Sequence, residues 1–139
     1  METQTSGNPE TAFASIAKDR YKILIHSQGH TIICDEAEES GGQDLGMNPF
    51  SLLLSSLAGS TVATIRRYAD NRNWHLDGAE VKIAFKKVVH SETVTLSKEI
   101  TLHGKLSREQ KTKLLLIASQ CTVHQILTND VFIDTSLSE

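Results

Sequence analysis

Two cysteines are the side chains of this sequence best suited to redox or nucleophilic chemistry. His124 follows Cys121 by three positions, a spacing at which a histidine in a helix can influence a thiol. A cysteine becomes reactive when a cation or a helix N-terminus lowers its pKa, whereas most buried cysteines behave as inert small apolar residues. The spacing alone favours an inert Cys121. Acidic residues follow Cys34 closely, and their charges raise a thiol pKa, so we interpret Cys34 as structural.

No other set of residues resembles a metal or cofactor site. The six histidines are scattered, and only His26 and His30 come near each other, at opposite ends of an expected turn. A zinc or iron site needs a tighter cluster of ligands. The glycine-rich segment 41–46 lacks the Lys-Ser/Thr pair of a phosphate-binding loop. We therefore predict no metal and no cofactor.

Length and charge limit the class of protein further. A chain of 139 residues is long enough for one domain, which we expect to span 1–139 with 1–17 as a loosely held tail. The formal net charge of −3, with mixed signs, leaves no basic surface for nucleic acid. The N-terminal segment lacks the pattern of a secretion signal, and two cysteines make no disulfide framework. These features predict a cytoplasmic protein.

One helix is expected to lie at the centre of the fold. Asn48 can cap it, Pro49 suits its first turn, and no charged side chain occurs from Leu45 to Ile65. Six Ser or Thr residues between 51 and 64 argue against a membrane span, although the length would permit one. A helix over 48–70 without a charged face must be covered on nearly all sides.

Strands and a second helix are expected around this central helix. Period-two alternation and turn residues predict an α+β chain in the order β-β-α-β-β-α-β, without repeats. The expected strands cover 21–26, 30–36, 79–90, 92–104 and 131–135, and the second helix runs from a capping box at Ser107 and Gln110 through Leu127. One modest sheet covers only one side of the central helix. We therefore predict a two-fold homodimer in which a second chain covers the other side.

Several motifs in this order resemble the OsmC/Ohr family (osmotically inducible protein C-like, organic hydroperoxide resistance). They are the GG-x-D-x-G-x-N-P turn at 41–49, the apolar run ending in Gly59-Ser60-Thr61, Arg66-Arg67-Tyr68-Ala69, Asn73-Trp74, Leu106–Gln110 and Cys121–Leu127. The resemblance implies an OsmC-like fold in an intertwined homodimer, with two active sites at the subunit interface. It also implies a thiol peroxidase that reduces organic hydroperoxides with a peroxidatic and a resolving cysteine.

Residue by residue, the resemblance transfers only in part. Cys121 matches the resolving cysteine, but the peroxidatic position falls on Ser60. The family's glutamate falls on Phe50-Ser51 and is absent, and Arg20 is the candidate for its arginine. A serine hydroxyl cannot cycle through a sulfenic acid, and without a base it is a poor nucleophile. Two-cysteine turnover is therefore not expected of this chain.

Three functions remain open on this evidence. The dimer could keep its interface pocket and bind a small apolar hydroperoxide or thiol ligand without turnover. It could act as a one-cysteine thiol peroxidase through Cys121 with an external thiol. It could also serve as a structural or regulatory dimer with no ligand. A membrane or nucleic-acid partner is not expected.

Overall fold

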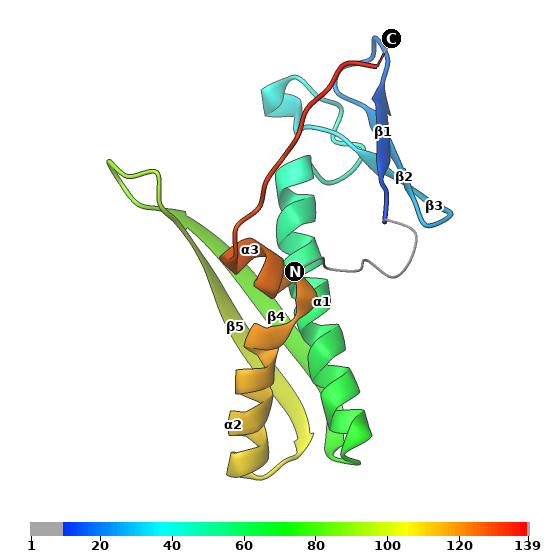
Figure 1. Cartoon of the computed structure of the whole chain (residues 1–139). Coiled ribbons are helices and arrows are strands. Elements are labelled where there is room, and N and C mark those ends of the chain that lie inside the picture. The colour runs from blue at the N-terminus through cyan, green and yellow to red at the C-terminus, as the bar shows by residue number, and fades with distance from the viewer. Residues whose placement is uncertain (1–9, 139) are drawn as a thin grey trace, which may run out of the picture. The chain divides into compact units, whose positions relative to one another are not determined.

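The computed structural model describes residues 10–138, which fall into two compact units, the first ending at Leu52 and the second beginning at Leu53. Figure 1 shows the elements in chain order. They are β1 (Phe13–Ile16), β2 (Ile23–Ser27), β3 (His30–Cys34), the 3-10 turn η1 (Glu38–Ser40), α1 (Pro49–Asn71), β4 (His75–Lys87), β5 (Val94–Lys105), α2 (Arg108–Ile117), η2 (Ala118–Gln120) and α3 (Thr122–Thr128). The predicted α+β class is confirmed. A single domain over 1–139 stays a prediction.

The N-terminal unit holds a three-stranded antiparallel sheet in the order β1-β2-β3. The hairpin between β2 and β3 closes with Ser27 opposite His30, so its loop has two residues. Gln28 and Gly29 have φ angles of 53° and 76°, the left-handed pair that matches the twist of the strands. The predicted hairpin at Ser27-Gln28-Gly29 is therefore confirmed.

A buried carboxylate organises the loop that follows this sheet. The Asp35 side chain is fully buried and accepts hydrogen bonds from four backbone N–H groups, those of Tyr21, Glu36, Gln43 and Leu45, at 2.7–3.3 Å. A Cβ atom on Gly42 would overlap the carbonyl of Glu36 and press on the Asp35 carboxylate. Glycine is therefore required at position 42, where the loop closes around this acid.

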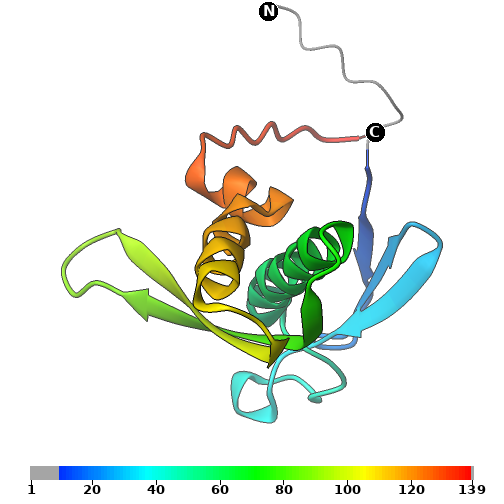
Figure 2. The ribbon, with the colours of Figure 1, turned by 90° about the horizontal axis from the view of Figure 1, so that it is seen from below.

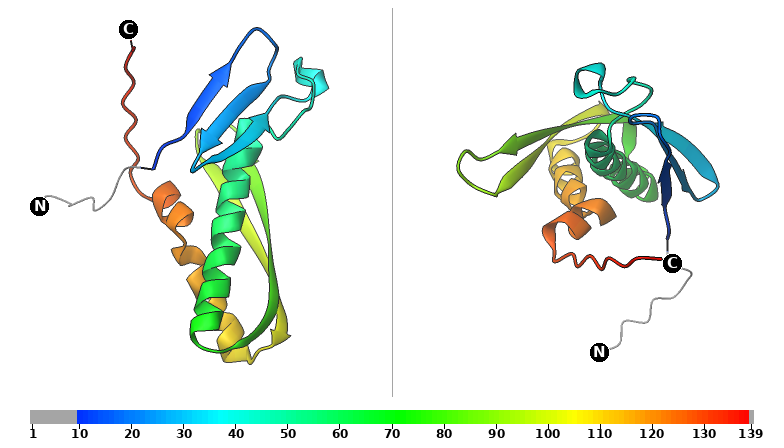
Figure 3. Two further views of the ribbon diagram at one scale, coloured as in Figure 1. Left: turned by 90° about the vertical axis from the view of Figure 1, so that its right-hand side faces the viewer. Right: turned by 90° about the horizontal axis from the view of Figure 1, so that it is seen from above.

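The second unit is built on the long β4–β5 hairpin. Its register places Val81 opposite Ile100 and Phe85 opposite Leu96. Figure 2 shows α1 and α2 side by side on one face of this hairpin, and Figure 3 shows the same arrangement from above. The core between them consists of Ile65, Ala69, Leu76, Leu114 and Ala118. Because all of these positions are apolar, burial of their area drives the packing of this unit.

Helix α1 begins as predicted but is buried along a single stripe. Asn48 Oδ1 accepts the Ser51 N–H at 2.7 Å, which confirms the expected cap. The buried stripe of the helix contains Leu57, Thr61, Ile65 and Ala69, whereas Gly59 and Ala63 are exposed. A single chain therefore leaves one side of α1 exposed. The coverage on nearly all sides that we expected for this helix is not reached within one chain. The covering of the exposed side by a second chain stays a prediction.

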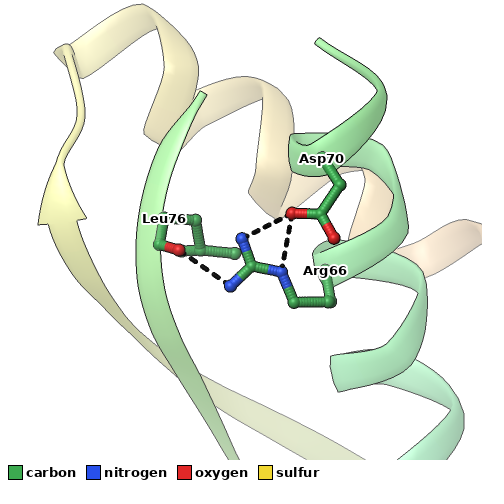
Figure 4. Close-up of polar contacts among 3 residues, drawn as sticks. All are labelled: Arg66, Asp70 and Leu76. Carbon is green, nitrogen blue, oxygen red and sulfur yellow. Dashed lines mark hydrogen bonds and ion pairs between the residues drawn. The ribbon is translucent and has the colours of Figure 1, made fainter. Parts of the chain in front are cut away.

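Arg66 ties the end of α1 to the start of β4 (Figure 4). Its guanidinium donates to Asp70 Oδ1 at 2.8 and 3.0 Å and to the Leu76 carbonyl at 2.7 Å. The ion pair between Arg66 and Asp70 is exposed, so it contributes only about 0.5 kcal/mol. The bond to Leu76 matters more for the fold, because it fixes the turn through Trp74 that brings the chain into β4.

The structure corrects the expected element order at both ends. Strand β1 lies within the segment 1–17 that we expected to be a loose tail, where it pairs with β2 from Phe13 opposite His26 to Ile16 opposite Ile23. Residues 1–9 of that expected tail lie outside the described residues. The expected strand 131–135 is wrong. The β-branched and aromatic residues there favour a strand, but a strand also needs a partner, and Phe132 and Ile133 remain 89% and 84% exposed.

A third correction concerns the second helix. It was expected to run from the capping box through Leu127, but it divides into α2, η2 and α3. Cys121 leaves the helical region, with φ −70° and ψ 154°. The Lys98 ammonium donates to the Ala118 carbonyl at 2.7 Å and so satisfies an acceptor near the break. The break places Cys121 at the start of a new helix.

The capping box of α2 offers a test of local stability. Ser107 Oγ accepts the Gln110 N–H at 3.1 Å, and Gln110 Oε1 accepts the Ser107 N–H at 2.9 Å. We expect Ser107→Ala to lower the free energy of unfolding by about 1 kcal/mol, measured by urea denaturation. Ser107→Asp keeps an acceptor and is the control. An equal loss in both variants would contradict this assignment.

In the described part of the chain, no helix is both long and apolar enough to cross a membrane.

Candidate functional site

Cys121 occupies the N-cap position of α3, in the second unit. Its side chain is 1% exposed, and its Sγ accepts the His124 N–H at 3.4 Å. The N–H groups of a first helical turn have no partner within the helix, so a sulfur in this position can satisfy one of them. An anionic sulfur accepts this bond more strongly than a neutral thiol does.

Two hydroxyl groups on α1 contact the same sulfur. Thr61 Oγ1 lies 3.7 Å from Cys121 Sγ, and the Ser60 side chain lies close enough to lower the pKa of the thiol. The Thr61 hydroxyl also donates to the Leu57 carbonyl at 2.7 Å. Since a hydroxyl has only one proton, Thr61 accepts from the neutral thiol and must rotate to donate to a thiolate. Ser60 is therefore the partner that can donate without breaking a bond within α1.

Lys98 on β5 is the cation of the site. Its Nζ lies 4.0 Å from Cys121 Sγ while it donates to the Ala118 carbonyl. In the period-two pattern of β5, Lys98 shares a face with Leu96 and Ile100, and all three are half-buried. A lysine on the apolar face of a strand thus brings its charge to a partly buried position beside Cys121.

These neighbours lower the pKa values of Cys121, Lys98 and His124. Burial raises the pKa of the Cys121 thiol, but hydrogen bonds from Ser60, the His124 N–H and Thr61, together with the charge of Lys98, bring this pKa below its ordinary value. Burial lowers the pKa of Lys98, and the charge on Cys121 partly opposes that shift. Burial and then the charge of Lys98 lower the pKa of His124. The surroundings of Cys121 thus make its thiolate easier to form than that of an ordinary cysteine, a feature that the spacing alone did not indicate.

The structure brings together two of the three residues proposed from the sequence. Ser60 and Cys121 are neighbours in the second unit, where the Ser60 side chain lowers the pKa of the thiol. Arg20 is exposed in the bend before β2, in the first unit, and its assignment stays a prediction. Cys34 is buried at the end of β3, and both cysteines are free thiols. Within residues 10–138 no group of three or more His, Cys, Asp or Glu is arranged to hold a metal ion.

Sequence reasoning missed Lys98 and Thr61. Lys98 carried a signal, because it interrupts the apolar alternation of β5 at an inward position where a charge has a cost. Thr61 carried a weaker one, as a polar residue at helical spacing between Leu57 and Ile65. Neither signal points to Cys121, which lies 23 and 60 positions away along the chain.

A small cleft of about 280 Å³ lies near the thiol. It is lined by Thr64, Arg67, Tyr68 and Asn71 of α1, and by Ile117 and Gln120. Gln120 directly precedes Cys121, and Thr64 lies one helical turn beyond Ser60 and donates to its carbonyl at 2.8 Å. The cleft therefore has a cationic and an aromatic wall close to the site.

Comparison with known proteins assigns the chain to a family. A model of the OsmC-like protein family matches residues 41–136. The chain belongs to the OsmC-like protein family. This finding confirms the resemblance to the OsmC/Ohr family, and the match includes Ser60, Lys98 and Cys121. No curated protein sequence gives a significant match to the chain.

Solved structures of OsmC-like proteins share the fold. An OsmC-like protein from Mycoplasma pneumoniae aligns with a TM-score of 0.72 and 16% identity, over 86% of this chain and 87% of that one. The organic hydroperoxide resistance protein OhrB of Bacillus subtilis gives 0.59 and 18%, over 88% and 93%. A Vibrio cholerae protein described as an organic hydroperoxide resistance protein, with captopril bound in one of its active sites, gives 0.63 and 19%, over 93% and 90%. At these identities the likeness concerns the fold alone.

Proposed function

We propose that this OsmC-like chain is a one-cysteine thiol peroxidase that reduces organic hydroperoxides through Cys121, with an external thiol as reductant. The observation that carries the proposal is the position of Cys121 Sγ, which accepts a helix N-terminal N–H and lies 4.0 Å from the Lys98 ammonium. Both features stabilise a thiolate, the form of cysteine that attacks peroxides. Serine at position 60 supplies a hydrogen bond to this thiolate but no second sulfur.

The reaction needs one sulfur in the protein. The Cys121 thiolate takes the terminal oxygen of the hydroperoxide, the O–O bond breaks, and the alkoxide leaves with a proton as the alcohol. The resulting sulfenic acid reacts with one thiol to form a mixed disulfide and water. A second thiol then releases reduced Cys121 and the external disulfide.

Burial of Cys121 sets the expected rate. With only 1% of its side chain exposed, a peroxide reaches the sulfur only when a neighbouring segment opens. Helix α3, with seven residues, is the shortest α-helix around the thiol. We therefore expect slow turnover.

We also propose that the active form is a homodimer, in which the second chain covers the exposed side of α1.

The direct test is loss of activity on removing the sulfur. We expect the chain to consume cumene hydroperoxide in the presence of dithiothreitol, and Cys121→Ser to reduce the protein-dependent rate at least about tenfold, because a hydroxyl does not form a sulfenic acid. Serine is itself a favoured N-cap, so the start of α3 is retained. Cys34→Ala, which removes the other thiol, is the control and should keep the rate. Equal rates for the chain and Cys121→Ser would exclude this function.

The cleft beside the site favours a second candidate, binding without turnover. Arg67 and Tyr68 offer a cation and an aromatic ring to a small ligand with an acidic group, and captopril is a suitable probe. A rise in melting temperature on adding captopril, without hydroperoxide consumption, would support this candidate over the peroxidase.

A further inference from the structure

We propose that Lys98 takes the part of the missing second cysteine, because its amine condenses with oxidised Cys121 to form a sulfenamide bond between Nζ and Sγ. The inference rests on the proposed function, since Cys121 must first be oxidised. It assigns to this chain a covalent, thiol-reversible link between β5 and the start of α3.

The geometry makes Lys98 the nucleophile best placed to reach the sulfur. Its Nζ lies 4.0 Å from Cys121 Sγ, and its hydrogen bond to Ala118 holds it on the same short segment. Ser60 and Thr61 are also neighbours, but their hydroxyls are weak nucleophiles without a base. The flexible stem of a lysine allows the amine to close the remaining distance to a covalent bond.

Burial favours this internal reaction over an external one. The side chain of Cys121 is 1% exposed, so a sulfenic acid there is shielded from thiols in solution. An amine already held beside it reacts as if present at a very high local concentration. The sulfenic acid is therefore expected to react with Lys98 before it meets a thiol from solution.

The charges around Lys98 change at the moment when a free amine is needed. The titratable groups that face Lys98 are Cys121 and His124. Burial lowers the pKa of Lys98, and the negative charge of the Cys121 thiolate opposes this effect. Oxidation to a neutral sulfenic acid removes that negative charge, so the pKa of Lys98 falls further. The lysine then holds its proton less tightly and can act as a nucleophile.

Each step balances in atoms and charge. The thiolate takes the terminal oxygen of the hydroperoxide while the Lys98 ammonium gives a proton to the departing alkoxide, leaving a sulfenic acid, an alcohol and a free amine. The amine nitrogen then attacks sulfur, and the sulfenic oxygen leaves as water. Two molecules of an external thiol return Cys121 to the thiol and Lys98 to the amine, with one external disulfide as product.

Mass spectrometry of the oxidised chain provides the test. The experiment uses the full chain carrying Cys34→Ala, because a disulfide between the two cysteines would have the same mass. After cumene hydroperoxide without thiol, we expect a chain lighter by two hydrogen atoms and a cross-linked peptide joining Lys98 to Cys121. Dithiothreitol should reverse both. Dimedone, which traps sulfenic acids, should label Cys121 poorly.

Lys98→Arg is the matched variant. Arginine keeps a cation and N–H donors near Ala118 and Cys121, but its guanidinium stays protonated and does not act as a nucleophile. In the same background we expect no cross-link, severalfold more dimedone labelling of Cys121, and further oxidation to sulfinic acid. If Lys98 acted only through its charge or in folding, dimedone would label Cys121 equally in the chain with Lys98 and in Lys98→Arg.

The outcomes separate the two proposals. If dimedone labels Cys121 strongly in both proteins and no cross-link appears in the chain that retains Lys98, the sulfenamide is excluded while the peroxidase function stands. If neither protein shows oxidation of Cys121 by any product, the proposed function fails, and this inference fails with it. If Lys98→Arg does not fold, the cross-linked peptide in the chain that retains Lys98 still decides.

Discussion

Ser60→Cys is expected to raise the rate of hydroperoxide consumption at least about tenfold and to form a disulfide with Cys121. The Ser60 side chain lies close enough to Cys121 to lower the pKa of its thiol, so we expect a thiol at position 60 to lie beside the existing one. Two neighbouring sulfurs can resolve a sulfenic acid directly, whereas the chain with Ser60 depends on Lys98 or on an external thiol. The substitution supplies the sulfur that the resemblance to OsmC/Ohr proteins implies at this position, but not the glutamate that is absent at Phe50-Ser51.

Ser60→Ala is the matched control, because it removes the hydroxyl and adds no sulfur. Both variants are compared in the Cys34→Ala background by hydroperoxide consumption and by counting free thiols after oxidation. We expect Ser60→Ala to react more slowly than the chain with Ser60, since Cys121 loses a hydrogen bond that lowers its pKa. If Ser60→Cys retains both thiols after oxidation, the two positions do not act together.

The largest loss of stability among single substitutions is expected for Asp35→Asn. The carboxylate is fully buried and accepts hydrogen bonds from four backbone N–H groups, two at each oxygen. In asparagine one of these oxygens becomes an NH₂ group, which is itself a donor and would face two backbone N–H groups. The loop from Glu36 to Leu45 would lose the acceptor around which it closes. We expect the melting temperature to fall by several degrees or more.

The same carboxylate gives stability a defined dependence on pH. Burial raises the pKa of Asp35, but its four backbone hydrogen bonds outweigh this and hold the pKa below its ordinary 3.8. A carboxyl whose pKa is lowered on folding stabilises the fold above its unfolded pKa, and that contribution is lost as the pH falls through the lower folded value. Acid should therefore weaken the chain with Asp35 below about pH 4, and Asp35→Asn should show less of this dependence.

Urea denaturation at neutral and acid pH measures both effects. Asp44→Asn is the control, because Asp44 is exposed in the same loop with φ 53°, and asparagine tolerates this conformation well. We expect its free energy of unfolding to stay within about 0.5 kcal/mol of that of the unsubstituted chain. Equal midpoints for the two variants would show that Asp35 does not hold the loop.

Local signals in the sequence were sufficient for the main elements. The Asn48 cap, the capping box of Ser107 with Gln110, and the glycine turn at Gly29 each involve neighbours within a few positions, and the structure confirms all three. The β4–β5 hairpin followed from alternation alone. Predictions failed where a strand depends on a distant partner. Segment 131–135 has the composition of a strand but pairs with no other strand in the described part of the chain. Strand β1 was not predicted, because it is defined by its pairing with β2.

The sequence by itself determined the α+β class, the start of α1 and the OsmC-like family, whereas the correspondence of Ser60 and Cys121 to a cysteine pair stays a prediction. Only the tertiary structure decided the character of Cys121. Its helix N-terminus exists because the chain breaks after α2, and its cation comes from β5 and its hydroxyls from α1. The pKa of a thiol depends on the charges and donors within a few ångströms of the sulfur, and packing of distant segments sets those distances.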